Sequence, residues 1–376
     1  MAMSNFSKLT NEQLTIWGRR VWKAARNTSF ILKNFSGEGS NAVIQRVTEL
    51  TETTKGTRAV FTLVPDLEGD GVVGDNQLEG NEEEIKAYDQ VIRYDQIRNA
   101  NRLEGRLADL KSAINFRQTS RELLSNWLAQ RLDELTFLIM SGVALSFRSN
   151  GAVRVGSQFP LLEFAADVTA PTANRHFRWD ATGGLSAADT TAIEAADTMS
   201  WDTIVAMKER AVESFLRPVS TDDGIELYHV FVSPRQMASL KRDQKFVEAM
   251  KYARERGQTN PLFKGTSMGG SASGIYIDGV NIVEYRHVFN TTGAAAGQKW
   301  GAAGNINGAR ALLVGAQALA LADIGVPKWV EKDFDYDNSP GVSIAKLIGF
   351  KKPVWRSQIT GTMEDFSIIA VDTATA

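Results

Sequence analysis

The clearest periodic pattern in the chain is a helical one in its first half. Five leucines recur at steps of four, four, three and three residues, which places them on one face of a helix: Leu124, Leu128, Leu132, Leu135 and Leu138. Thr119 and Glu122 have the spacing of an N-terminal capping pair, and Gly142 supplies a C-terminal stop. From Phe116 to Met140, such a helix is about 37 Å long at about 1.5 Å per residue. The pattern therefore predicts one long helix from Phe116 to Met140.

A shorter amphipathic helix is predicted near the start of the chain. Thr10 and Gln13 have capping-box spacing, and Leu9 stands where it can contact Leu14. The helix then presents an apolar stripe composed of Leu14, Trp17, Val21, Trp22 and Ala25. Such a face must be buried against something. Two interpretations are open: the stripe docks on the chain's own core, or the segment is an arm whose Trp17 and Trp22 lie on a neighbouring subunit.

Alternating apolar and polar positions predict a ribbon around a turn at Lys55-Gly56. Residues 42–50 and 57–64 alternate as its two strands would, and residues 85–97 return as a third extended segment. A two-stranded ribbon of this size is not stable by itself. We therefore expect it to need support from another part of the protein or from a second subunit.

The segment 65–84, which precedes the third extended segment, is acidic and rich in glycine. It contains four glycines, no Lys or Arg, and eight acids: Asp66, Glu68, Asp70, Asp75, Glu79, Glu82, Glu83 and Glu84. A segment of one charge sign repels itself and projects into solvent. Residues 66–71 copy the opening of a calcium loop, but the twelfth position is Gln77, which lacks the carboxylate that binds calcium through both oxygens. We interpret the segment as an assembly contact and not as a metal site.

The second half of the chain has the pattern of strands with flanking helices. Residues 201–215 have helical periodicity. Residues 227–232 form an apolar strand, after which Ser233 and Pro234 start a helix by the usual capping rules. Three further segments are apolar or strand-like: residues 311–322, 329–352 and 365–372. A strand followed directly by a helix indicates an α/β module within a protein of mixed helices and strands.

Composition limits the classes of protein that fit. At 376 residues the chain is long enough for two packed cores. Its 42 Lys and Arg against 44 Asp and Glu leave no overall positive charge to attract nucleic acid. The absence of Cys excludes disulfides and fits a reducing cytoplasm. No apolar run reaches the length of about 18 residues that a membrane span needs, so we expect a cytoplasmic protein with no membrane partner.

The side chains that catalysis would need do not converge in the sequence. His176, His229 and His287 lie far apart, and His229 alternates with apolar residues as a core histidine does. Ser273 lacks the glycine two positions earlier that a nucleophile elbow requires, and no phosphate-binding Gly-Lys-Ser/Thr loop occurs. We therefore predict that the protein is not an enzyme and has no catalytic, cofactor-binding or metal-binding residues. A metal-dependent hydrolase built on segment 65–84 is the alternative from that class.

Several short blocks of sequence resemble one protein family. They are WKAAR at 22–26, GEGS at 37–40, VIQRVTEL at 43–50, GVVGD at 71–75 and LEGNEE at 78–83. With these blocks the chain resembles the major capsid proteins of tailed bacteriophages related to that of the N-four phage. A looser similarity, through NPLFKG at 260–265 and FDY at 334–336, extends over most of the chain. Residues 149–198 and 293–308 match nothing in the family pattern.

The resemblance implies the α+β fold of Hong Kong 97-type capsid subunits. It divides the chain into an N-terminal arm (1–38), an extended hairpin loop (39–101), a peripheral domain with a spine helix (102–216), an axial domain (217–328) and a return to the peripheral domain (329–376). It further implies pentamers and hexamers that form an icosahedral shell around double-stranded DNA. Because the subunit is nearly neutral, we expect the DNA to be retained by enclosure and not by affinity. An encapsulin-like compartment shell is the structural alternative.

The resemblance also implies partners and a location. The main partner is the chain itself, and because no long acidic or coiled-coil stretch precedes Leu9 we expect a separate scaffolding protein. A portal protein is expected too, and a decoration protein is left open. Assembly would take place in the host bacterial cytoplasm, and the product is the virion capsid. The candidate assembly contacts are Trp17, Trp22, Asp66, Asp70, Asp75, Glu79, Glu82, Glu83 and Glu84, with Arg117, Arg121 and Arg131 of the spine helix as candidate partners of the acids.

Overall fold

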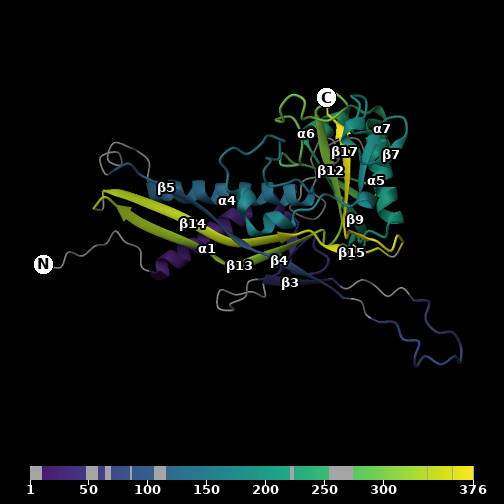
Figure 1. Cartoon of the computed structure of the whole chain (residues 1–376), viewed down its shortest axis with the longest axis horizontal. Helices are drawn as coiled ribbons and strands as arrows, with labels where there is room; N and C mark the ends of the chain where they lie inside the picture. The colour runs from purple at the N-terminus through teal and green to yellow at the C-terminus, as the bar shows by residue number, and fades with distance from the viewer. Residues whose placement is uncertain are drawn as a thin grey trace.

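The computed structural model describes residues 11–47, 58–63, 69–84, 87–105, 116–220, 224–253, 274–336, 338–357 and 359–375. In it the protein is elongated: a long β-hairpin and a long helix run side by side, and a compact lobe lies at one end of them (Figure 1). The helices are α1 (Asn11–Thr28), α2 (Phe30–Asn34), α4 (Phe116–Met140), α5 (Trp201–Glu213), α6 (Pro234–Arg242) and α7 (Gln244–Ala253). Short 3-10 helices are η1 (Phe159–Leu161), η2 (Glu163–Asp167), η3 (Ala173–Arg175) and η4 (Thr190–Ala192).

Within the described residues the strands form two large sheets and two small ones. In the first half of the chain they are β1 (Ser36–Gly37), β2 (Ile44–Val47), β3 (Arg58–Leu63), β4 (Tyr88–Arg93), β5 (Asp95–Arg102), β6 (His176–Asp180) and β7 (Gly184–Ala187). In the second half they are β8 (Val219–Ser220), β9 (Glu226–Val232), β10 (Ile275–Ile277), β11 (Val280–Glu284), β12 (Gly308–Val314), β13 (Leu319–Phe334), β14 (Ser339–Lys351), β15 (Val354–Arg356), β16 (Met363–Asp365) and β17 (Ile368–Ala374).

The body of the molecule is a five-stranded sheet in the order β1-β2-β13-β14-β5, with α1 and α4 packed on it. Its two long strands, β13 and β14, form an antiparallel hairpin whose register shifts between Ile324 and Lys328. The predicted helix from Phe116 to Met140 is confirmed as α4. All five leucines of its repeat are buried in the main core. They are buried because α4 packs on the β13–β14 hairpin on one side and against α1 on another.

The compact lobe is the eight-stranded sheet, in the order β10-β11-β9-β12-β17-β6-β7 with β8 beside β9, together with α5, α6 and α7 (Figure 1). The predicted strand-to-helix step is confirmed. After β9, Ser233 caps α6: its hydroxyl accepts from the backbone N–H of Gln236, and the Gln236 side chain accepts from the Ser233 N–H. This reciprocal pair is a capping box and fixes where the helix begins.

The predicted ribbon pairing is wrong. Residues 44–47 lie in the body as β2, parallel to β1 and β13, whereas β3 pairs antiparallel with β4, the strand that follows the acidic segment. Alternation identifies a strand but not its partner. Ile44 is buried in the main core, while the inner side chains of the β3–β4 ribbon form a separate small core: Ala59, Phe61, Leu63 and Ile92.

The sheets also cross the predicted domain limits. Strands β6 and β7 and helix α5 fall in the range 102–216 assigned to the peripheral domain, yet they belong to the compact lobe. Strand β17, in the range 329–376, also lies in the lobe, whereas β2 and β5 from the extended-loop range 39–101 lie in the body. The domain limits differ because strands far apart in sequence pair with one another, and such pairing cannot be predicted from a local sequence pattern.

Candidate assembly surfaces

The tryptophans of α1 contact the chain's own body. Trp22 is buried, and the ammonium of Lys346 lies 4.6 Å from the centre of its ring. Trp17 is half-buried, with its ring 5.9 Å from that of Trp329 on β13 and the Arg121 guanidinium 5.2 Å from its centre. The structure thus follows the first interpretation of the stripe, docking on the chain's own core. Trp22 is not accessible to a neighbouring subunit, and α1 instead exposes Ile16, Arg19 and Arg20.

A buried carboxylate on α4 joins this arm to the rest of the molecule. Asp133 accepts hydrogen bonds from the Ser29 hydroxyl at 2.6 Å and from the backbone N–H groups of Phe30 and Ile31 at 3.1 and 3.3 Å. It also accepts from the hydroxyl of Tyr285, which follows β11, at 2.5 Å. The pKa of Asp133 is raised above its ordinary value, because the effect of burial is larger than the opposing effect of these four hydrogen-bond donors. Sequence periodicity missed this residue, since an acid beside the leucine repeat resembles a solvent-facing one.

Ion pairs also fill the junction between body and lobe. The carboxylate of Asp372 on β17 accepts two hydrogen bonds from the Arg310 guanidinium, at 2.7 and 2.9 Å. Its oxygen also lies 2.8 Å from Nε2 of His176. Although burial opposes it, Arg310 together with His176 holds the pKa of Asp372 below its ordinary value. Nearby, buried Lys352 pairs with Asp365 at 2.9 Å. Buried charges of this kind are retained only when each has its partner, so we assign these groups to the framework and not to a reaction.

The described part of the acidic segment, residues 69–84, is the acidic loop, and it extends from the ribbon away from the body (Figure 1). Two hydrogen bonds close turns within the loop: Glu83 accepts from the N–H of Gly69, and Glu82 accepts from that of Gly80, both at 2.7 Å. The acids Asp70, Asp75, Glu79, Glu82, Glu83 and Glu84 are all exposed, whereas Asp66 lies outside the described residues. Val73 and Leu78, 78% and 60% exposed, stand among them.

The arginines proposed as partners of these acids interact within their own subunit. Arg117 pairs with Glu331 at 2.9 Å, and Arg131 pairs with Glu134 one turn along α4 at 2.5 Å. Arg121 lies over the Trp17 ring. Salt bridges already made within the subunit would have to be broken or shared before these side chains could bind the acidic loop of another copy.

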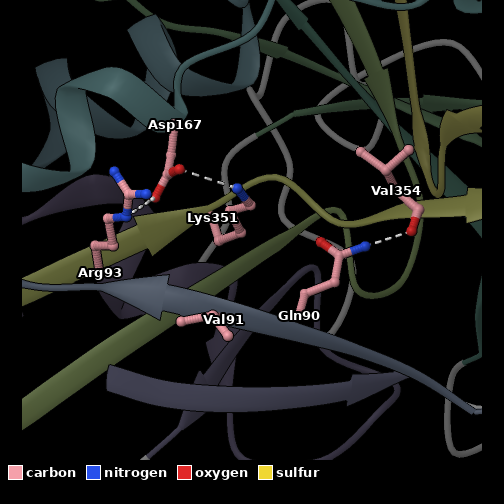
Figure 2. Close-up of a pocket in the computed structure, with 6 residues that line it drawn as sticks. All are labelled: Gln90, Val91, Arg93, Asp167, Lys351 and Val354. Carbon is pink, nitrogen blue, oxygen red and sulfur yellow. Dashed lines mark hydrogen bonds and ion pairs between the residues drawn. The ribbon is translucent and has the colours of Figure 1, made fainter. Parts of the chain in front are cut away.

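A different positive site lies where the ribbon meets the body. Figure 2 shows this hollow of 420 Å³, the root hollow, lined by Gln90, Val91 and Arg93 of β4, Asp167 of η2, Lys351 of β14, and Val354 of β15. Arg93 and Lys351 both point at Asp167, at 3.8 and 3.3 Å. The side-chain amide of Gln90 donates to the carbonyl of Val354. Sequence analysis did not find this set, because its members come from three distant segments.

The tip of the β13–β14 hairpin presents an exposed aromatic ring. Tyr336 is fully exposed, and both it and Asp335 have left-handed backbone, with φ of 48° and 51°. Phe334, one residue before the turn, is held by the Arg102 guanidinium at 4.3 Å and the Lys332 ammonium at 4.9 Å. The hairpin therefore displays at its tip a ring that the described part of the subunit does not bury. Asp335 belongs to this turn, directly after the end of β13.

The histidines occupy structural positions. His229 packs edge-on against Phe35 at 5.0 Å and lies 3.2 Å from the Asn281 side chain, and burial lowers its pKa to about 4. His287 lies 3.4 Å from the Ser149 hydroxyl. Within the part of the chain that the structure describes, no three His, Asp or Glu side chains are grouped to hold a metal ion. The helices of that part also include none with the length and apolar character of a membrane span.

Comparison with known proteins gives consistent matches along the chain. The family described as phage capsid protein matches residues 5–376. The major capsid protein of Pseudomonas phage KPP25 is 50% identical over 371 residues, which cover 98% of this chain and 96% of that protein.

Solved structures of phage capsids also match this chain. The capsid of Ralstonia phage GP4 matches with a TM-score of 0.73 and 27% identity, covering 93% of this chain and 91% of the other. The capsid subunit of cyanophage Pam1 matches with a TM-score of 0.67 and 19% identity over the whole of both chains. The overall fold is thus one that these two capsid subunits share.

Proposed function

The chain belongs to the phage capsid protein family as the major capsid protein of a phage, and on this basis we propose that it assembles as pentamers and hexamers into an icosahedral shell around double-stranded DNA. Its fold is the Hong Kong 97-type capsid fold, a mixture of helices and strands. The observation that carries the proposal is the 50% identity with a major capsid protein over 98% of the chain. Repeated heterologous contacts that close around symmetry axes give rings and then shells.

We propose that the acidic loop is one of these contacts. It carries acids without a Lys or Arg, stands away from the body, and exposes two aliphatic side chains that a solvated loop does not need. A surface that combines like charges with exposed apolar groups gains free energy when a partner of opposite charge covers it. Trp17 is a weaker candidate, because its ring already packs on Trp329.

DNA would be retained by the closed shell and not by affinity for single subunits. The net charge of -2 gives no long-range attraction to phosphate. Subunits kept unassembled should therefore bind DNA only weakly in a mobility-shift assay at physiological salt. Sub-micromolar binding there would contradict this part of the proposal.

Two rival functions have distinct tests. An encapsulin-like compartment would yield purified particles that contain protein cargo, whereas a phage capsid yields particles that contain DNA. A metal-dependent hydrolase would require tight calcium or magnesium binding by the isolated subunit together with turnover, both of which calorimetry can measure. The family to which the chain belongs is a structural one and not a class of enzymes.

The test of the proposal is to express the subunit with its scaffolding protein and to image the product by negative-stain electron microscopy. Closed shells are the expected result, and scattered monomers under all conditions would contradict the proposal. A separate scaffolding protein, a portal protein at one vertex and assembly in the host cytoplasm complete the proposed pathway, with a decoration protein as an optional addition. Their presence can be read from the proteins that copurify with shells from infected cells.

A further inference from the structure

The acidic loop has the composition of a ligand for a positive, partly apolar site. Between residues 69 and 84 the loop has six acids and no Lys or Arg. Val73 and Leu78 are 78% and 60% exposed among them. The partner must therefore offer cations beside an apolar surface, on a part of the molecule that the loop of another copy can reach.

The root hollow has this character. Arg93 and Lys351 share the single carboxylate of Asp167, which leaves one positive charge in excess among these three groups. The Arg93 side chain is 47% exposed and the Lys351 side chain 23%, so both can approach a second carboxylate without leaving Asp167.

An apolar strip borders the hollow. Val91 lines it and is 38% exposed, and its cross-strand partner on β3, Val60, is 51% exposed. Two aliphatic side chains paired on the outer face of a ribbon are unfavourable in water unless they are covered. The cations and this strip lie on one side of the ribbon's base, within reach of a single short segment of chain.

We propose that the acidic loop of one copy docks in the root hollow of a second copy, with a loop carboxylate between Arg93 and Lys351 and a loop aliphatic side chain on Val91. The proposal rests on the proposed function, since it identifies the receptor for the assembly contact. Charge complementarity selects the occupant: a purely acidic loop meets a hollow with an excess cation. The loop extends away from the body of its own subunit, so the receptor belongs to another copy (Figure 1).

Disulfide trapping tests the contact, and no disulfide can form between natural residues because the chain has no Cys. A variant carrying both Leu78→Cys and Val91→Cys is assembled under reducing conditions and then oxidised. If the loop of each copy lies in the hollow of the next, denaturing gels without reductant show a ladder of linked chains. Variants with only one of these substitutions give dimers at most. Dilute unassembled subunits remain monomeric, which shows that the link forms between copies.

A matched control pairs Leu78→Cys with Val212→Cys, since Val212 is similarly exposed at 56% but lies on α5 in the compact lobe. No ladder is expected from it. If shells of the test variant form but give no ladder, or if the control gives an equal ladder, the docking inference is overturned while the proposed function stands. A cross-link within dilute single subunits overturns it too. Failure of the wild-type chain to form shells with its scaffolding protein contradicts the proposed function itself.

Discussion

The carboxylate of Asp133, in the C-terminal half of α4, lies 2.6 Å from the hydroxyl of Ser29, the residue that caps α2. The Ser29 hydroxyl donates to Asp133 and also accepts from the backbone N–H of Leu32, so one side chain both starts the short helix and ties it to the long one. Because Tyr285 donates to the same carboxylate, the arm, α4 and the chain leaving β11 meet at a single acid.

Replacing this acid should destabilise the subunit. Asp133→Ala leaves two hydroxyls and two backbone N–H groups without their acceptor, and we expect the free energy of unfolding to fall by about 3 kcal/mol. Asp133→Asn keeps one oxygen acceptor and should cost less. Urea unfolding of the unassembled subunit measures both. Glu209→Ala, at an exposed position on α5, is the control and should stay within about 0.5 kcal/mol of wild type. A loss for Asp133→Ala no larger than the control's would contradict the assigned role.

The folded subunit should lose stability in mild acid through His229. Burial lowers its pKa from 6.5 to about 4, so the folded form keeps the ring neutral while the unfolded chain takes up a proton below pH 6.5. The contribution is therefore complete above pH 6.5 and is lost as the pH falls towards 4. At about 1.4 kcal/mol for each pH unit, the effect between pH 6.5 and 5 is about 2 kcal/mol.

The variant that tests this pH dependence is His229→Phe, which keeps a ring beside Phe35 but does not titrate. Its stability should change less than that of wild type between pH 6.5 and 5, in unfolding curves measured at each pH. His287, whose pKa burial likewise lowers to about 4, is retained and should preserve part of the slope. Equal slopes for variant and wild type would show that His229 is not the group responsible.

Tyr336→Gly should stabilise the unassembled subunit. Left-handed backbone costs a residue with a side chain about 1–2 kcal/mol, and glycine removes that cost but has more freedom to lose on folding. The net expectation is a gain of about 0.5–1 kcal/mol in thermal unfolding. Tyr336→Ala is the matched control, because alanine retains the unfavourable backbone and should give little gain. A loss of stability in the glycine variant would mean that the exposed ring makes a stabilising contact within the subunit.

The charge of the acidic loop should matter for assembly but not for folding. Converting Glu82, Glu83 and Glu84 to Lys should leave the thermal midpoint of the subunit almost unchanged and suppress shell formation. Each exposed pair contributes only about 0.2–1 kcal/mol, but the pairs recur at every subunit, and raised salt should weaken them in wild type. The control has the same change in net charge on the compact lobe: Glu209→Lys, Glu213→Lys and Glu226→Lys. If the loop variant assembles normally but loses a bound divalent ion, the loop is a metal site and its interpretation as an assembly contact is wrong.

The sequence predicted best what is local. Helix α4 is predicted from Phe116 to Met140 because its leucine period lies within the helix and Gly142, which ends it, follows two residues later. The proposed capping pair, Thr119 and Glu122, instead lies inside the helix and does not mark its start. The start of α6 at Ser233 followed from capping chemistry confined to four residues. Both features depend on neighbours in sequence, so periodicity and capping rules are sufficient to find them.

Features that join distant segments could not be predicted in this way. The pairing of β3 with β4 bridges the acidic segment, and nothing in either strand excluded β2 as the partner. Asp133 carries the same charge as a solvent-facing acid, and only the packing of α2 onto α4 shows that it is buried. The root hollow joins Arg93, Asp167 and Lys351, which are brought together only once the ribbon lies on the body. The acidic loop was visible in the sequence, whereas the root hollow that we propose as its receptor was not.

The order in which the chain is synthesised has a consequence for the compact lobe. Strand β17 is made after every other strand of its sheet, yet it lies between β12 and β6, and all of its residues are buried. Until residues 368–374 leave the ribosome, β12 and β6 each present an open edge, and the sheet cannot close. A subunit in which β17 has not yet been made therefore lacks a finished lobe. The synthesis of β17 thus sets the earliest moment at which the lobe of each copy is complete.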